Sequence, residues 1–126
     1  CGSGNNGGDG YALSLLLRKG GIDCTVFVLS EPTTGDSRFF YNQCLEQKIP
    51  LLPFMETTIL SSFPVIVDCI FGTGFHGEAT GLALAAIRAV NLSGAFIISA
   101  DINSGLNSRT VLGMCKFRPD RSHRIL

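Results

Sequence analysis

Three short runs of almost wholly apolar residues limit the folds that this chain can adopt. They cover residues 25–29, 64–70 and 95–99 and are rich in valine, isoleucine and phenylalanine. An unbroken apolar run of this length is typical of a strand buried on both faces, whereas a strand with one solvent-exposed face alternates apolar and polar residues. Burial on both faces needs helices on each side of the sheet. The sequence therefore predicts an α/β fold with a mostly parallel sheet.

Helical segments separate these runs, and we expect helices over residues 9–19, 36–48 and 82–92. The apolar faces expected are Tyr11, Ala12, Leu15 and Leu16 in the first helix, and Phe39, Phe40 and Leu45 in the second. Residues 49–63 are ambiguous, with a short strand at residues 51–52 and a helical turn after Pro53 as one interpretation. The alternation of helix and strand predicts a Rossmann-like, three-layer αβα domain with right-handed crossovers.

Both ends of the sequence differ from a complete domain of this kind, although 126 residues leave room for one domain. The chain begins at Cys1, inside a glycine-rich loop of the type that normally follows a strand. Residues 116–124 hold five basic residues in nine together with a proline, a composition typical of a solvated tail. We therefore interpret the chain as truncated at both ends, with an incomplete core over residues 1–106 and a divergent, poorly ordered tail over residues 107–126.

Composition excludes several classes of protein. Ten basic residues balance ten acidic ones, so nothing favours nucleic acid as a partner. The apolar runs are too short to span a bilayer, which argues against a membrane protein. The five cysteines are odd in number and scattered, so they indicate neither a disulfide framework nor a zinc site. They favour a reducing setting, the cytoplasm or an organelle in a eukaryote.

Three loops rich in glycine or acidic residues are expected to meet at the carboxyl ends of the strands, where open α/β sheets bind their ligands. They cover residues 2–10, 68–77 and 101–105. The first reads GSGNNGGDG and runs into a helix, whose N-terminus suits an anion such as a phosphate. The alternative is a turn that only caps the helix, with Asp9 as the cap.

The other two loops each place an acid after a buried run. Asp68 is either a ligand of metal or substrate, or a cap for nearby backbone N–H groups. Asp101 follows the most apolar run directly and is a candidate general acid or base, with an Asx-type turn as its alternative role. His76 is interpreted as a solvent-exposed loop residue.

Taken together, the three loops resemble the motifs of the NAD(P)H-hydrate epimerase family, also called the YjeF N-terminal domain. The string NNGGDG at residues 5–10 matches the family's GxGNNGGDG loop without interruption. Residues 68–75 match its D-x-x-[FL]-G-T-G loop, and residues 101–105 match D-[IV]-P-S-G with Asn103 in place of proline. The resemblance ends near residue 106, because Arg109 and Val111 stand where an acid and a glycine are expected.

The resemblance implies an isomerase that interconverts the R and S epimers of hydrated NADH or NADPH, a metabolite-repair reaction. By position, it implies that the substrate is bound by Asn5, Asn6, Gly7, Gly8, Asp9, Gly72, Thr73, Gly74, Phe75, His76, Gly77, Glu78 and Asp101. It makes Asp101 the catalytic residue and implies a potassium ion held by Asn6, Asp68 and Ser104. Its implied partners are a second copy of the chain and an ADP-dependent hydrate dehydratase, fused or separate.

Two alternatives remain open. A domain of this fold can serve as a catalytically inactive nucleotide-binding or protein-interaction module, because a fold does not determine a function. An ordinary Rossmann oxidoreductase would use an acid after the second strand to hold the ribose, and Glu31 is the candidate. The string NNGGDG and the GTG loop are not needed by such an oxidoreductase.

Overall fold

The computed structural model describes residues 1–102, residue 104 and residues 123–125. Its elements are α1 (Asn5–Lys19), β1 (Val26–Val28), α2 (Gly35–Glu46), β2 (Leu51–Pro53), β3 (Val65–Asp68), α3 (Gly81–Leu92), β4 (Phe96–Ser99) and β5 (His123–Ile125). The pairings of β1 with β2, of β3 with β4 and of β4 with β5 are all parallel. The predicted α/β class with a mostly parallel sheet is confirmed.

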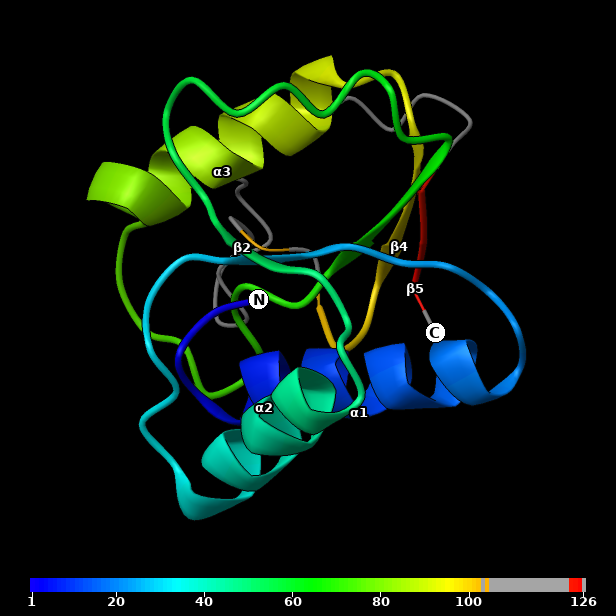
Figure 1. Cartoon of the computed structure of the whole chain (residues 1–126). Coiled ribbons are helices and arrows are strands. Elements are labelled where there is room, and N and C mark those ends of the chain that lie inside the picture. Colours follow the sequence, from blue (N-terminus) through cyan, green and yellow to red (C-terminus); the bar gives the residue numbers. More distant parts are fainter. Residues whose placement is uncertain (103, 105–122, 126) are drawn as a thin grey trace.

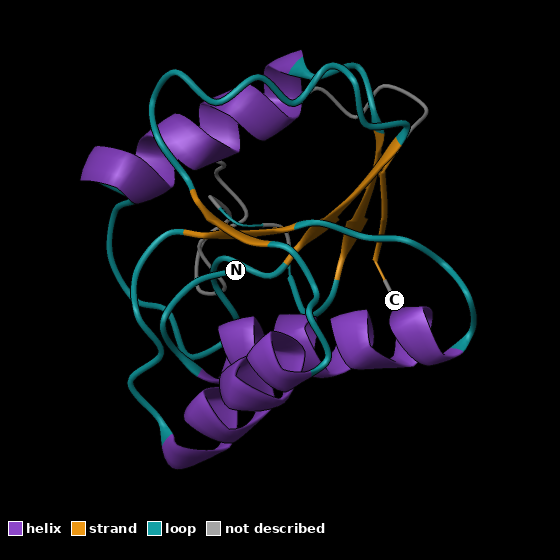
Figure 2. Ribbon diagram, viewed as in Figure 1, coloured by secondary structure: helices purple, strands orange, loops and turns teal. Residues whose placement is uncertain are grey.

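Helices cover both faces of the strands (Figure 1). The strands form two sheets, β1-β2 and β3-β4-β5, within the described residues. They lie between α3 on one side and α1 with α2 on the other, as Figure 2 shows by colour. This arrangement is the Rossmann-like three-layer αβα fold expected from the apolar runs.

The hydrophobic core is divided by the strands into two clusters. One lies against α3 and includes Ile87, Val90 and Ile97. The other lies against α1 and α2 and includes Tyr11 and Cys44. Because successive side chains of a strand point to opposite faces, a strand between two such clusters needs apolar residues at consecutive positions. This explains the unbroken apolar runs.

The first helix begins earlier than predicted. It starts at Asn5 with Gly4 as its N-cap, so Asp9 lies inside the helix and is not its cap. Asparagine and glycine are poor helix formers, but close packing favours them here. A Cβ atom at Gly7 would overlap the carbonyl oxygen of Gly2, and one at Gly8 would lie 3.0 Å from the Cβ of Ser37 on α2.

The close packing of α1 against α2 also explains why the predicted apolar faces of these two helices differ from the observed ones. Leu16, Phe39 and Leu45 are 65%, 59% and 51% exposed, so the prediction that they face the core was wrong. Ser37 and Cys44 of α2 are fully buried instead. The two helices pack so closely that small side chains occupy the contact and the large apolar ones lie outside it.

Two uncertain segments have different outcomes. The short strand expected at residues 51–52 is confirmed as β2, but the helical turn after Pro53 is replaced by a turn in which Thr58 N donates to Met55 O at 2.9 Å. Residues 123–125, in the segment expected to lack regular structure, form β5. Residues 105–122 lie outside the described residues, and the domain boundary at residue 106 stays a prediction.

In the described part of the chain, no helix is long and apolar enough to cross a membrane.

The N-cap of α2 supports a stability prediction. Thr34 Oγ1 accepts a hydrogen bond from Ser37 N at 3.3 Å and donates one to Ser37 Oγ at 2.8 Å. Thr80, the N-cap of α3, makes no such side-chain bond. We expect Thr34→Ala to lower the free energy of unfolding by about 1 kcal/mol, and the matched change Thr80→Ala to cost clearly less. Urea unfolding measures both; equal losses would contradict the capping role of Thr34.

Candidate functional site

The first loop is anchored on both sides. Gly2 N donates to Cys69 O at 2.9 Å, at the end of β3, while Ser3 O accepts from Thr33 N at 2.8 Å, in the segment after β1. No side chain caps α1 at Gly4. The first-turn N–H groups of a helix have no intrahelical partner, so those of residues 5–7 can meet a ligand. The N–H of Gly8 is already donated to Gly4 O at 3.1 Å.

Asn6 is the most informative residue of this loop. Its side chain is buried, and Nδ2 donates to Phe71 O at 2.8 Å. That bond identifies Oδ1 as the other amide atom, and Oδ1 is buried without a hydrogen-bond partner. An unsatisfied buried acceptor costs about 1–3 kcal/mol. The atom is therefore a candidate ligand for a cation or for a bound water.

Asp68 joins the second loop to the third. Its carboxylate is buried at the end of β3, and Oδ1 accepts from Ser104 Oγ at 2.7 Å and from Ile70 N at 3.1 Å. Oδ2 accepts from Ser104 N at 2.8 Å. Ser104 Oγ in turn accepts from Phe71 N at 2.9 Å. The bonds to backbone N–H groups show that Asp68 has the capping role that the sequence left open, and a carboxylate retains lone pairs for a further ligand.

Asp101, which follows β4, contacts the second loop as well. Thr73 N donates to Asp101 Oδ2 at 2.6 Å. A Cβ atom at Gly72 would lie 2.6 Å from Asp101 Oδ2 and 3.3 Å from the Cβ of Asn6. Only glycine at this position lets both side chains approach so closely, which gives the first glycine of the GTG string a steric role.

The rest of the second loop is stiffened by aromatic stacking. The rings of Phe71 and Phe75 lie 3.7 Å apart between centroids with an interplanar angle of 14°, and Phe75 N donates to Gly72 O at 2.9 Å. His76 is exposed, as predicted, and so is Glu78. Neither side chain is tied into the hydrogen bonds around Asn6 and Asp101 that are described above.

The structure therefore brings together a subset of the predicted site residues. These are Asn6, Asp68, Gly72, Thr73, Asp101 and Ser104. Asn5 and Asp9 lie exposed on α1, and Gly7 and Gly8 are buried in close packing. Gly74 and Gly77 are exposed in the second loop.

The sequence analysis did not identify the central role of the Phe71 backbone. Its C=O accepts from Asn6 and its N–H donates to Ser104, so one peptide segment connects the first and third loops. These are backbone groups, and no residue type signals them.

Burial raises the pKa of the Cys69 thiol to about 12, so this neighbour of Asp68 stays protonated and is no nucleophile.

A family model described as YjeF-related protein N-terminus matches residues 1–120. This chain belongs to that family. The match includes all three loops of the site, so the resemblance inferred from the three motifs is confirmed.

Several curated proteins of the YjeF-related family are similar to this chain. The bifunctional NAD(P)H-hydrate repair enzyme Nnr of Coxiella burnetii is 35% identical over 109 residues, covering 85% of this chain and 22% of that protein. The NAD(P)H-hydrate epimerase of Limosilactobacillus reuteri is 31% identical over 110 residues, covering 87% and 52%. The NAD(P)H-hydrate epimerase of Caenorhabditis briggsae is 36% identical over 105 residues, covering 83% and 44%. The chain thus spans about a fifth to a half of the length of these relatives.

Proposed function

We propose that this domain is an NAD(P)H-hydrate epimerase, an isomerase that interconverts the R and S epimers of hydrated NADH and NADPH. The observation that carries the proposal is the convergence of Asn6, Gly72 and Asp101 beside the N-terminus of α1. Relatives whose names state this activity share the family, which supports the substrate class.

The first loop is suited to the phosphate groups of the dinucleotide. The helix N-terminus carries a positive partial charge and free N–H donors, and its N-cap, Gly4, has no side chain that could bond to them. The site lies at the carboxyl ends of β3 and β4, the usual ligand edge of a doubly wound sheet. We assign substrate contacts to the first-turn backbone, to Gly72 and Thr73, and to Asp101.

The chemistry follows from the substrate. The damaged ring carries a hydroxyl on the carbon next to the ring nitrogen, and inversion at that carbon needs its C–O bond broken and remade. Acting as the general acid, the Asp101 carboxyl gives its proton to the hydroxyl, the C–O bond breaks as the nitrogen lone pair moves toward carbon, and water leaves. Water then adds to the opposite face of the ring, and the proton that it loses returns to Asp101 through solvent. The bond from Thr73 N holds this carboxyl in place.

A potassium ion is the proposed cofactor, and the residues present fit it. Asn6 contributes a buried oxygen without a partner, and Asp68 and Ser104 lie one peptide segment away through Phe71. Amide, carboxylate and hydroxyl oxygens are the donors that a hard cation prefers. Bound there, the ion would supply positive charge that holds the three loops together.

The cation site makes a prediction with a readout independent of activity. We expect potassium chloride to raise the melting temperature more than sodium chloride does at equal ionic strength. A ligand at 100 times its Kd stabilises by about 2.7 kcal/mol. Asn6→Leu, which removes Oδ1, should abolish the potassium-specific part, while Asn5→Leu on the exposed side of α1 should retain it. Equal stabilisation by both salts would contradict the site.

The activity itself is tested with R-NADHX, the R epimer of hydrated NADH, incubated with the protein that carries this domain and followed by chromatography. Appearance of the S epimer faster than in buffer supports the proposal. Tight binding of R-NADHX without conversion would favour the inactive binding module. Hydride transfer in a dehydrogenase assay would favour the oxidoreductase, for which Glu31 is exposed just beyond β1. The homodimer and the dehydratase partner stay predictions.

A further inference from the structure

The segment that follows β1 is held against the first loop on both sides of Glu31. On the amino side, Leu29 N donates to Cys1 O at 3.1 Å. On the carboxyl side, Thr33 donates to Ser3 O twice, through its backbone N at 2.8 Å and through Oγ1 at 3.0 Å. Glu31 lies midway between these two attachments, and its side chain is exposed. The fold therefore fixes an acidic residue beside the glycine-rich loop.

The carboxylate of Glu31 takes no part in holding this segment. The neighbouring Pro32 is buried, and its C=O accepts a hydrogen bond from Arg38 Nε at 3.1 Å. None of the hydrogen bonds and ion pairs among the described residues uses the Glu31 carboxylate. The backbone is thus anchored while both carboxylate oxygens are available to a ligand.

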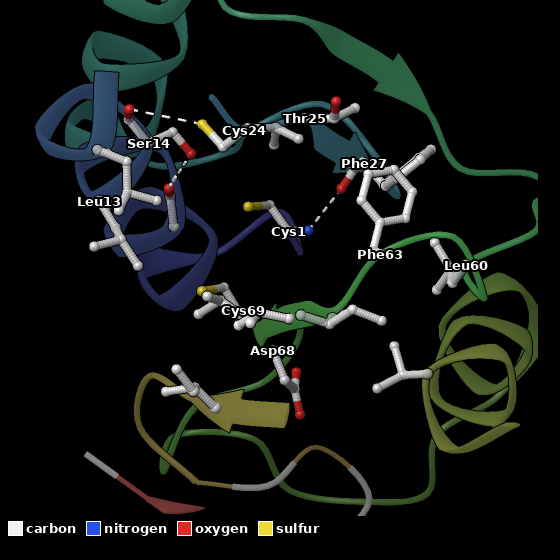
Figure 3. Close-up of a pocket in the computed structure, with 18 of the residues that line it drawn as sticks. Cys1, Leu13, Ser14, Cys24, Thr25, Phe27, Leu60, Phe63, Asp68 and Cys69 are labelled. Carbon is white, nitrogen blue, oxygen red and sulfur yellow. Dashed lines mark hydrogen bonds between the residues drawn. The ribbon is translucent and has the colours of Figure 1, made fainter. Parts of the chain in front are cut away.

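The direction of the bound dinucleotide follows from the proposed function, on which this inference rests. In that function Asp101, which follows β4, acts on the damaged nicotinamide ring, and the first turn of α1 holds the phosphates. The loop before α1 lies between the two sheets, because Gly2 N donates to Cys69 O at 2.9 Å and Figure 3 shows Cys1 between Phe27 and Cys69. The two halves of an extended dinucleotide lie on opposite sides of its pyrophosphate. The adenosine half therefore extends toward the carboxyl end of β1.

We propose that Glu31 binds the adenosine ribose and makes the site prefer hydrated NADH to hydrated NADPH. A carboxylate accepts a hydrogen bond from the ribose 2′-hydroxyl, and in dinucleotide-binding sheets the acid that does so follows the glycine-rich loop by about 20 residues. Glu31 follows Gly10, the last glycine of the first loop, by 21 residues. In NADPH the same ribose oxygen carries a phosphate, whose negative charge the carboxylate repels.

Arg38 carries the opposite charge near this segment and would favour the opposite preference. Arginine is the usual partner of a 2′-phosphate. The bond from Nε to Pro32 O, however, already uses part of the guanidinium to hold the fold. Glu31 lies between the two attachments to the first loop and has no such commitment, so we assign the recognition of the ribose to Glu31.

The first test compares kcat/KM for hydrated NADH and hydrated NADPH in the protein that carries this domain. We expect a preference for hydrated NADH of about tenfold or more, the effect of one close pair of like charges. Glu31→Gln, which removes the charge, should bring the ratio close to one, and Glu31→Arg should reverse it. Asp36→Asn, a change at an exposed acid on α2, should leave the ratio as it is in the unaltered protein. Equal use of both substrates, or a ratio that Glu31→Gln does not change, would overturn the proposal.

The second test measures binding without turnover. ADP-ribose and its 2′-phosphate lack the nicotinamide ring, and calorimetry gives the Kd of each. We expect ADP-ribose to bind about tenfold or more tightly, and Glu31→Gln to remove the difference. Equal Kd values, or no binding of either compound, would contradict the ribose site. A protein that does not convert R-NADHX but binds ADP-ribose more tightly would contradict the epimerase activity and still support the role of Glu31.

Discussion

Alanine in place of Gly7 is expected to prevent the first loop from packing onto α1 and to lower the free energy of unfolding by more than about 4 kcal/mol. A Cβ atom at this position overlaps the carbonyl oxygen of Gly2 and also approaches its carbonyl carbon. Both are backbone atoms. Gly2 N also donates a hydrogen bond to Cys69 O at the end of β3, so Gly2 cannot move without losing that hydrogen bond. Urea unfolding followed by circular dichroism measures the loss.

Gly4 provides the matched control in the same loop. A Cβ atom there has no atom within 4 Å, and the backbone φ of −88° suits any residue. Gly4→Ala should therefore retain most of the stability of the chain. If Gly7→Ala unfolds at the same urea concentration as Gly4→Ala, the packing described for the first loop is incorrect.

Asp101→Asn is expected to slow epimerisation by about 10²–10⁴-fold, the usual contribution of a positioned general acid or base. The asparagine oxygen can still accept the hydrogen bond from Thr73 N, so the loop and the affinity for hydrated NADH should change little. Separate measurements of kcat and of the substrate Kd distinguish this result from misfolding.

A surface aspartate serves as the control for charge alone. Asp23 forms an exposed ion pair with Arg18 at 2.9 Å, beyond the C-terminal end of α1, whereas the first loop lies at the N-terminal end of that helix. Asp23→Asn should leave kcat unchanged. Turnover by Asp101→Asn equal to that of the unaltered protein would remove Asp101 from the mechanism.

Much of the fold could be predicted from three apolar runs, because a strand covered on both faces leaves a signature that no surface strand produces. The start of α1 could not. Asn5 to Gly10 read as a loop by intrinsic propensity, and only the contacts of Gly7 with Gly2 and of Gly8 with Ser37 explain why helix is favoured there. The exposure of Phe39 has the same cause, since the separation of α1 and α2 is a tertiary property.

The site was predictable in outline. Loops at the carboxyl ends of parallel strands must share one edge of the sheet, which places Asn6, Asp68 and Asp101 near one another before any coordinates are known. The sequence left the role of Asp68 open between capping and ligand binding, and its bonds to Ile70 N and Ser104 N show that it caps. The connection through the backbone of Phe71 was not predictable, because any residue supplies those groups.

Incubation of R-NADHX in water enriched in ¹⁸O, with the protein that carries this domain and potassium present, most directly tests whether the three loops form an epimerase site. We expect the S epimer to form well above the spontaneous rate and to carry one solvent ¹⁸O at the inverted carbon. Formation of S-NADHX no faster than in buffer, from protein shown to be folded, would contradict the epimerase assignment.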